Sequence, residues 1–228
     1  MKNLLQLSIL LLAALPGAPA EVSTETGEAR LERFLAAMGG REAWGRIRSV
    51  TVRATHYETD LRLPYANAIW NDFDRPRVRF EARSADIDRV RTLDGDSGWR
   101  TREGAFARLT PEQVTEDKRW WEANVYRTLH RLALRDPDLS VRAVGANRLE
   151  VWRSDGVRLN WFELNPAGEP VRFGTWDSDV GTVFGPLASA GAVKHPRWGA
   201  NAAGTWRYEV SEFIPSDQPP AASFATPQ

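Results

Sequence analysis

The chain has 228 residues, with 30 basic and 30 acidic side chains and no cysteine. The balanced charge argues against recruitment of nucleic acid by net charge, and the lack of cysteine excludes disulfide bonds, thiolate metal ligands and a lipid anchor on an N-terminal cysteine. Ten tryptophans are present, which is more flat, polarisable surface than a core of this size ordinarily uses.

The first twenty residues predict a cleavable signal peptide. Lys2 gives a positive start, a short apolar stretch runs from Leu4 to Leu15, and an Ala-x-Ala exit ends at Ala20. A membrane span needs roughly 20 apolar residues, so this stretch is too short for an uncleaved anchor. We therefore expect cleavage after Ala20, a periplasmic protein and no membrane-spanning segment.

A helix is predicted over residues 28–38, where apolar side chains recur at helical spacing. Gly39 and Gly40 follow it, and glycine can adopt the left-handed conformation that ends a helix. A short apolar set around Trp44 then leads into a first strand beginning at Ser49, whose residues are β-branched and alternate. The spacing of apolar side chains changes here from the helical period of 3.6 residues to the strand period of 2.

Alternation continues through most of the remaining sequence. Residues 77–83 place Val78, Phe80 and Ala82 on one face and charged side chains on the other. Short links such as Asp94-Gly95 favour antiparallel pairing. About nine to eleven strands are expected in one domain spanning 21–215, with a glycine-rich loop over 179–201 and a flexible tail over 216–228.

A second helix is predicted in the middle of the chain. Thr110 and Pro111 resemble an N-cap followed by proline at the first helical position, and the apolar stripe continues to about Leu134. Trp120 and Trp121 are adjacent and point about 100° apart around a helix. One of them is therefore expected to line a cavity or the surface.

The sequence offers little that points to catalysis or to a metal. The histidines His56, His130 and His195 are dispersed, with no carboxylate partner at ligand spacing. The acidic residues between 86 and 96 lack the glutamate of a calcium loop and fit a solvated turn. No glycine-rich phosphate loop precedes a helix. From these observations together, we expect neither a metal nor a cofactor.

Five segments, in this order and spacing, resemble the LolA-like outer-membrane lipoprotein-sorting superfamily over about residues 28 to 215. They are the helix end Gly39-Gly40-Arg41-Glu42-Ala43-Trp44, the strand start Ile47-Arg48-Ser49-Val50, the turn Leu93-Asp94-Gly95-Asp96-Ser97-Gly98-Trp99, the helix start Leu109-Thr110-Pro111-Glu112, and Gly191-Ala192-Val193-Lys194-His195-Pro196.

The resemblance implies a mainly β (α+β) fold, a curved antiparallel half-barrel with N-terminal and mid-chain helices covering its concave face. It further implies a periplasmic carrier that binds lipid or lipoprotein acyl chains without catalysis. Two alternatives stay open: an envelope module that binds another protein, and a cofactor-free enzyme using Arg79, Glu81 or His56. The enzyme is disfavoured because Arg79 and Glu81 alternate with Phe80 and so face away from it.

Alternation and the stripe of the mid-chain helix predict which side chains face the cavity. A competing interpretation is that the indoles only fill a wide core. The predicted cavity residues are Phe80, Trp99, Trp120, Trp121, Val125, Leu129, Trp161, Phe173, Trp206 and Tyr208.

Overall fold

The computed structural model describes residues 25–176, 178, 180–222 and 224–226, so the predicted signal peptide lies outside the described residues. Within them the helices are α1 (Gly27–Ala37), α2 (Arg41–Arg46), α3 (Pro111–Glu122) and α4 (Val125–Ala133). The strands are β1 (Ser49–Glu58), β2 (Tyr65–Asp72), β3 (Arg77–Arg83), β4 (Asp88–Asp94), β5 (Ser97–Arg102), β6 (Ala105–Arg108), β7 (Leu139–Val144), β8 (Arg148–Arg153), β9 (Arg158–Leu164), β10 (Pro170–Thr175), β11 (Thr182–Phe184), β12 (Leu187–Ala190), β13 (Val193–Pro196), β14 (Trp198–Asn201) and β15 (Trp206–Ser216).

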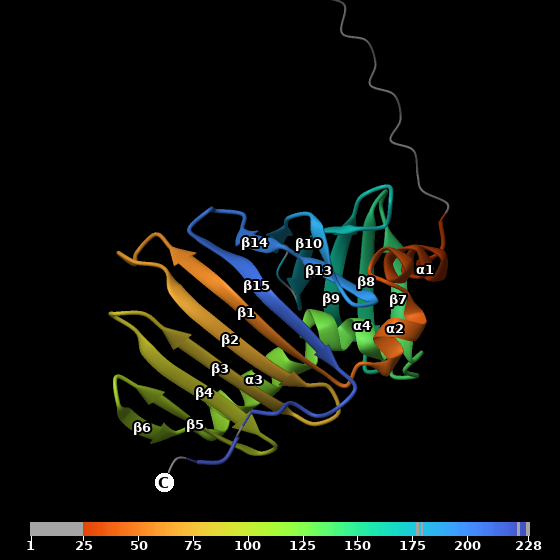
Figure 1. The fold of residues 1–228 in the computed structure, drawn as a ribbon. Helices are drawn as coiled ribbons and strands as arrows, with labels where there is room; N and C mark the ends of the chain where they lie inside the picture. Colours follow the sequence, from red (N-terminus) through yellow and green to blue (C-terminus); the bar gives the residue numbers. More distant parts are fainter. Residues whose placement is uncertain (1–24, 177, 179, 223, 227–228) are drawn as a thin grey trace, which may run out of the picture.

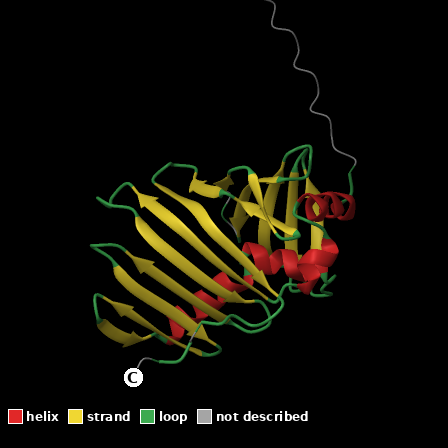
Figure 2. Cartoon of the chain, viewed as in Figure 1, coloured by secondary structure: helices red, strands yellow, loops and turns green. Residues whose placement is uncertain are grey.

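Thirteen of these strands form one antiparallel sheet in the order β6-β5-β4-β3-β2-β1-β15-β14-β11-β10-β9-β8-β7, and β12 and β13 form a separate hairpin. The edges β6 and β7 do not pair with each other, so the sheet remains open. Figure 1 shows it curving, with α3 and α4 crossing its concave side, and Figure 2 shows the helices on that same side. The predicted fold class is confirmed.

The strands outnumber the nine to eleven expected because residues 180–201 are not a loop. This stretch contains β11 to β14, and β11 and β14 join the main sheet. Its glycines permit close packing: a Cβ at Gly185 would meet the Trp198 indole at 2.2 Å, and one at Gly199 would meet the Tyr208 ring at 2.6 Å. A composition typical of loops therefore reflects contact between backbone and aromatic rings.

The mid-chain helix is two helices, which corrects the prediction of one continuous helix to Leu134. The predicted N-terminus is confirmed, since the Thr110 hydroxyl accepts from the Gln113 amide and the Gln113 side chain accepts from the Thr110 amide. The break comes at Asn124, whose side-chain oxygen accepts from the backbone amides of Tyr126 and Arg127. Asparagine competes for backbone hydrogen bonds and so starts a new helix here.

The main hydrophobic core lies where α1, α2 and α4 meet the sheet. Phe34, Trp44, Leu129, Leu149 and Phe162 are fully buried in it. The predicted N-terminal helix and the strand from Ser49 are confirmed as α1 and β1. A smaller cluster of Leu93, Leu109, Val114 and Trp121 lies under α3. The helices are therefore packed unequally along the sheet.

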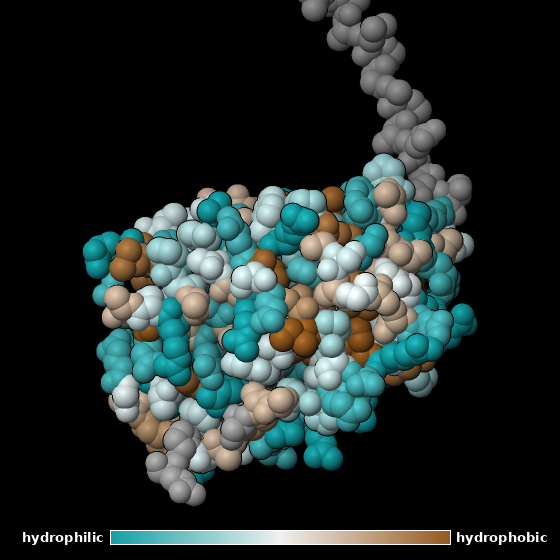
Figure 3. All heavy atoms as spheres, in the orientation of Figure 1, coloured by the Kyte–Doolittle hydropathy of each residue, from teal (hydrophilic) through white to brown (hydrophobic). Residues whose placement is uncertain are grey.

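The outer face of the sheet is largely hydrophilic with scattered apolar residues, as Figure 3 shows. Beyond β15 the chain returns across this face, where Phe224 is buried and its carbonyl accepts from Trp99 Nε1 at 3.1 Å. The Arg77 guanidinium lies 4.3 Å from the centroid of the Phe224 ring. At Phe224 the chain thus differs from the flexible tail expected over 216–228.

Candidate functional site

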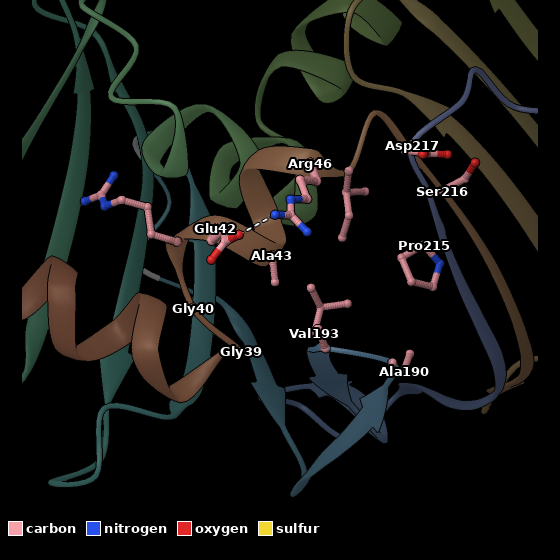
Figure 4. Close-up of a pocket in the computed structure, with 14 residues that line it drawn as sticks. Gly39, Gly40, Glu42, Ala43, Arg46, Ala190, Val193, Pro215, Ser216 and Asp217 are labelled. Carbon is pink, nitrogen blue, oxygen red and sulfur yellow. Dashed lines mark hydrogen bonds and ion pairs between the residues drawn. The ribbon is translucent and has the colours of Figure 1, made fainter.

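Two cavities in the described part of the chain have similar volumes and are larger than a third, of about 280 Å³. One, of about 600 Å³, lies between α2, the β12–β13 hairpin and the end of β15, and Figure 4 shows its lining. Glycine, alanine and charged residues predominate, and Arg46 pairs with Glu42 at its rim. No aromatic side chain of the described residues lines it. It offers less apolar surface to a hydrophobic ligand than the second cavity does.

The other cavity, of about 650 Å³, lies between α3 and the concave face of the sheet. We call it the aromatic cavity. Its apolar wall consists of side chains from strands β2, β3, β4, β10, β11 and β15 and from helices α3 and α4 with the link between them. The apolar lining residues are Ile69, Val78, Phe80, Leu93, Trp120, Trp121, Ala123, Val125, Phe173, Phe184, Trp206 and Tyr208.

The two adjacent tryptophans of α3 close the cavity in different ways. Trp121 is buried, its Nε1 donates to the Asp72 carbonyl, and the Arg127 guanidinium lies 3.6 Å from its ring centroid. Trp120 is 54% exposed and meets Trp176 edge-on, with ring centroids 4.5 Å apart. As predicted, the pair diverges, so Trp121 anchors α3 while Trp120 offers an indole at the cavity mouth.

Polar groups are few along the cavity wall. Arg91 on β4 forms an ion pair with Asp117 on α3 at 2.8 Å, which joins the sheet to the helix across the cavity. Glu116 lies beside this pair and is exposed. Asn71 on β2 also lines the wall and is 4% exposed. The cavity is thus mainly apolar, with a compensated charge pair, and its uncharged polar lining residues are Asn71, Asn124, Thr175 and Thr182.

A cluster around His56 packs against Trp206 and Tyr208 of the cavity wall. Trp206 Nε1 donates to His56 Nδ1 at 3.2 Å, and the rings of Tyr65 and Tyr208 stack on the imidazole with centroids 5.1 and 5.7 Å away. Burial lowers the pKa of His56 from 6.5 to about 4, while the Asn67 side chain has a smaller opposing effect. Burial likewise raises the pKa of Tyr208. Both groups are therefore neutral near pH 7.

Seven of the ten side chains predicted for the cavity line it. They come from two helices and from strands distant in sequence: Phe80, Trp120, Trp121, Val125, Phe173, Trp206 and Tyr208. The period-2 alternation of β3, β10 and β15 placed the strand residues on the correct face.

The other three predicted residues lie elsewhere, which corrects their assignment. Trp99 pairs with Thr92, whose neighbours face the cavity, so both point outward. Trp161 pairs with Gly174, the residue after Phe173, and also points outward, where Arg148 covers its ring. Leu129 is fully buried in the main core.

Sequence reasoning missed several residues of the cavity wall. Ile69 and Asn71 alternate with Trp70 on β2, and that alternation was available as a signal. Thr182 and Phe184 alternate too, but they lie in the stretch predicted as a loop. They were not predicted to line the cavity because β11 was not predicted as a strand.

Of the three residues considered for a catalytic role, His56 lies beside the cavity, against Trp206 and Tyr208, and the other two do not. Arg79 and Glu81 lie on the outer face, where Arg79 Nε donates to Glu81 at 2.7 Å. Among the described residues no group of three or more histidine, cysteine or acidic side chains could hold a metal ion. In that same part of the chain no helix is long and apolar enough to cross a membrane.

Comparison with known proteins gives similarity of fold. No family model and no curated protein matches the chain. A LolA superfamily protein from Nitrosomonas europaea is 11% identical, with a TM-score of 0.42 over 86% of this chain and 96% of that chain. A putative outer membrane lipoprotein-sorting protein domain from Vibrio parahaemolyticus is 10% identical, with a TM-score of 0.44 over 83% and 93%.

A DUF1329 family protein from Desulfovibrio piger is also 10% identical, with a TM-score of 0.40 over 83% of this chain and 93% of that chain. These likenesses concern the fold alone.

Proposed function

We propose that this chain is a periplasmic binding protein that holds one hydrophobic or lipidic ligand in the aromatic cavity, without catalysis. The observation that carries the proposal is the cavity itself, about 650 Å³ of space walled by aromatic and aliphatic side chains under α3. Sites for small ligands are typically apolar clefts of ~300–1,000 Å³ with a few polar groups. The signal peptide predicted from the sequence supports placement in the envelope.

The volume of the cavity favours an acyl chain as the ligand. A methylene group takes up about as much space as one water molecule, ~30 Å³, so the cavity has room for about 20 methylene groups. This matches one long acyl chain and is too little for three. Each buried methylene contributes ~0.8 kcal/mol, so desolvation of the chain offsets the cost of association.

The first experiment identifies the ligand of the protein made in its own envelope. Native mass spectrometry of the purified protein, followed by organic extraction, is expected to release a lipid. Removal of that lipid should shift the Trp emission, because Trp120, Trp121 and Trp206 line the cavity. A clean apo mass, with no emission change when acyl chains are added, would reject the carrier.

A pair of variants on β11 tests where the ligand binds. Thr182 faces the cavity and Val183, the next residue, faces the opposite way. Thr182→Trp should fill the cavity and weaken binding of acyl chains more than about 10-fold, whereas Val183→Trp should leave binding unchanged. Equal binding by both variants, with thermal unfolding showing that both fold, would place the ligand elsewhere.

An envelope protein partner is the alternative outcome of these experiments. It is favoured if the purified protein carries no lipid and retains a partner from the envelope after both β11 substitutions. In that case the cavity would be an incidental gap under α3.

A further inference from the structure

The side chain of Asn71 is a buried amide without a protein partner. Asn71 is 4% exposed and lines the aromatic cavity, and its amide makes no hydrogen bond with any residue that the structure describes. Asn160 shows the usual arrangement: fully buried, it donates to the Ala123 carbonyl at 2.8 Å and accepts from the Thr128 hydroxyl at 2.7 Å. The Asn71 amide therefore stays open to the cavity, whereas that of Asn160 is used within the protein.

The surroundings of Asn71 leave its amide free to meet a ligand. The next residue, Asp72, uses its side-chain oxygen for the backbone amides of Asp74 and Arg75 and its carbonyl for Trp121. On the cavity side Asn71 has apolar neighbours, with Val78 paired to it across β2 and β3. An amide in such a place costs free energy unless something supplies a donor or an acceptor.

The charges of the cavity wall restrict what that group can be. The described cation that lines the wall, Arg91, is paired with Asp117, and Glu116 adds a second carboxylate. An anionic head group beside Asn71 would meet net negative charge among these lining residues, because the one described cation that lines the wall is already paired. An amide both donates and accepts, which suits an uncharged ester, amide or hydroxyl group.

We propose that Asn71 is the polar anchor of the aromatic cavity and hydrogen-bonds an uncharged carbonyl or hydroxyl group on a single-chain lipid. This inference rests on the proposed function, since it requires a lipid in the cavity. It adds the class of ligand, a neutral amphiphile such as an acyl ester or an acyl amide. A free fatty acid is outside this class.

The test compares probes of equal chain length in displacement of N-phenyl-1-naphthylamine from the wild type and from Asn71→Leu. The probes are methyl palmitate, hexadecanamide, palmitate and hexadecane. The wild type should bind the ester and the amide about 5- to 10-fold more tightly than hexadecane, the range expected for one hydrogen bond. Asn71→Leu should reduce that preference to about 2-fold or less and still bind hexadecane.

A matched control removes a polar group from the opposite face of the sheet. Thr51 on β1 pairs with Trp70, the residue before Asn71, and Thr51→Val deletes its hydroxyl with little change of shape, so it should keep the preference for the ester and the amide. The free protein gives a second measurement. Asn71→Leu should raise the melting temperature without ligand, since it removes an unpaired amide, whereas loss of a structural hydrogen bond would lower it.

The possible failures are distinguishable. If Asn71→Leu keeps the full preference, or if Thr51→Val removes it, the anchor is not Asn71 while the binding function stands. If the wild type binds palmitate more tightly than the ester, the ligand class is wrong. If no probe displaces the dye from the folded wild type, the proposed function fails and the inference fails with it.

Discussion

The two helices of the mid-chain segment lie against the sheet in contrasting ways. α4 buries six of its nine residues and packs with β8 and β9 in the main core. α3, with twelve residues, buries only Val114 and Trp121. The space left between α3 and the sheet is the aromatic cavity. One helix therefore completes the core and the other roofs a cavity, although only two residues separate them.

The difference arises from the side chains that hold each helix. α4 presents Leu129, Leu132 and Ala133 in one buried stripe. α3 is attached by the small cluster around Val114, by the Arg91–Asp117 and Lys118–Asp96 ion pairs, and by the indole of Trp121. Ion pairs at the surface contribute only ~0–1 kcal/mol. We expect α3 to open at lower free-energy cost than α4.

The largest expected effect is the loss of core packing under α4. Leu129→Ala should lower the free energy of unfolding by about 3–5 kcal/mol, because a fully buried leucine leaves a cavity. Val114→Ala under α3 is the control and should cost about 1.5 kcal/mol, the transfer of two methyl groups. Urea unfolding measures both. Equal losses would contradict the unequal packing.

The pH dependence of stability should follow His56, which packs against Trp206 and Tyr208 of the aromatic cavity. Its pKa is lowered from 6.5 to about 4, so the unfolded chain takes up the proton at a higher pH than the folded one. Stability is full above pH 6.5 and is lost as pH falls toward 4, by about 3 kcal/mol for a shift of this size.

The groups facing His56 give this prediction its control. They are the side chains of Asn67, Tyr65 and Trp206, the ring of Tyr208, and Glu58, which accepts from Tyr65. His56→Gln should flatten the loss of stability between pH 6.5 and 4, as measured by urea unfolding. The pKa values of His130 and His195 are also lowered by burial, and they contribute equally in both proteins. An unchanged pH profile would contradict the prediction.

Substitution of the N-cap residues of α3 and α4 should distinguish local unfolding of one helix from global unfolding of the protein. Asn124→Ala removes the cap of α4 and should lower the free energy of unfolding by about 1 kcal/mol. Thr110→Ala removes the capping box of α3 and should mainly speed amide hydrogen exchange within α3. Exchange by mass spectrometry distinguishes them. Uniform acceleration across the protein in both variants would show that α3 and α4 unfold together.

The smallest effect on stability is expected at the cavity mouth. Trp120→Ala should change the free energy of unfolding by about 0.5 kcal/mol or less, because the indole is 54% exposed. It should still weaken acyl-chain binding measurably. Trp198→Ala, a partly exposed tryptophan away from the aromatic cavity, should leave binding unchanged. Equal affinities of the two variants would remove Trp120 from the ligand site.

Much of the fold could be predicted from local patterns. The helical spacing of apolar residues and the two glycines after them predicted α1 and its end. The proline after Thr110 predicted the start of α3. The break at Asn124 was missed because its neighbours on both sides carry one apolar stripe. The strands over 182–201 were missed because each is three or four residues long, too short for a period to be recognised.

The sequence by itself determined an antiparallel sheet with alternating faces, because side chains alternate with period 2 whatever lies above them. Only the tertiary structure decided which face the helices cover. Trp161 and Phe162 are adjacent and both fully buried, so alternation could not choose between them. Phe162 packs in the core and Trp161 is covered on the outer face by Arg148. That choice depends on pairing between distant segments, which a local pattern does not contain.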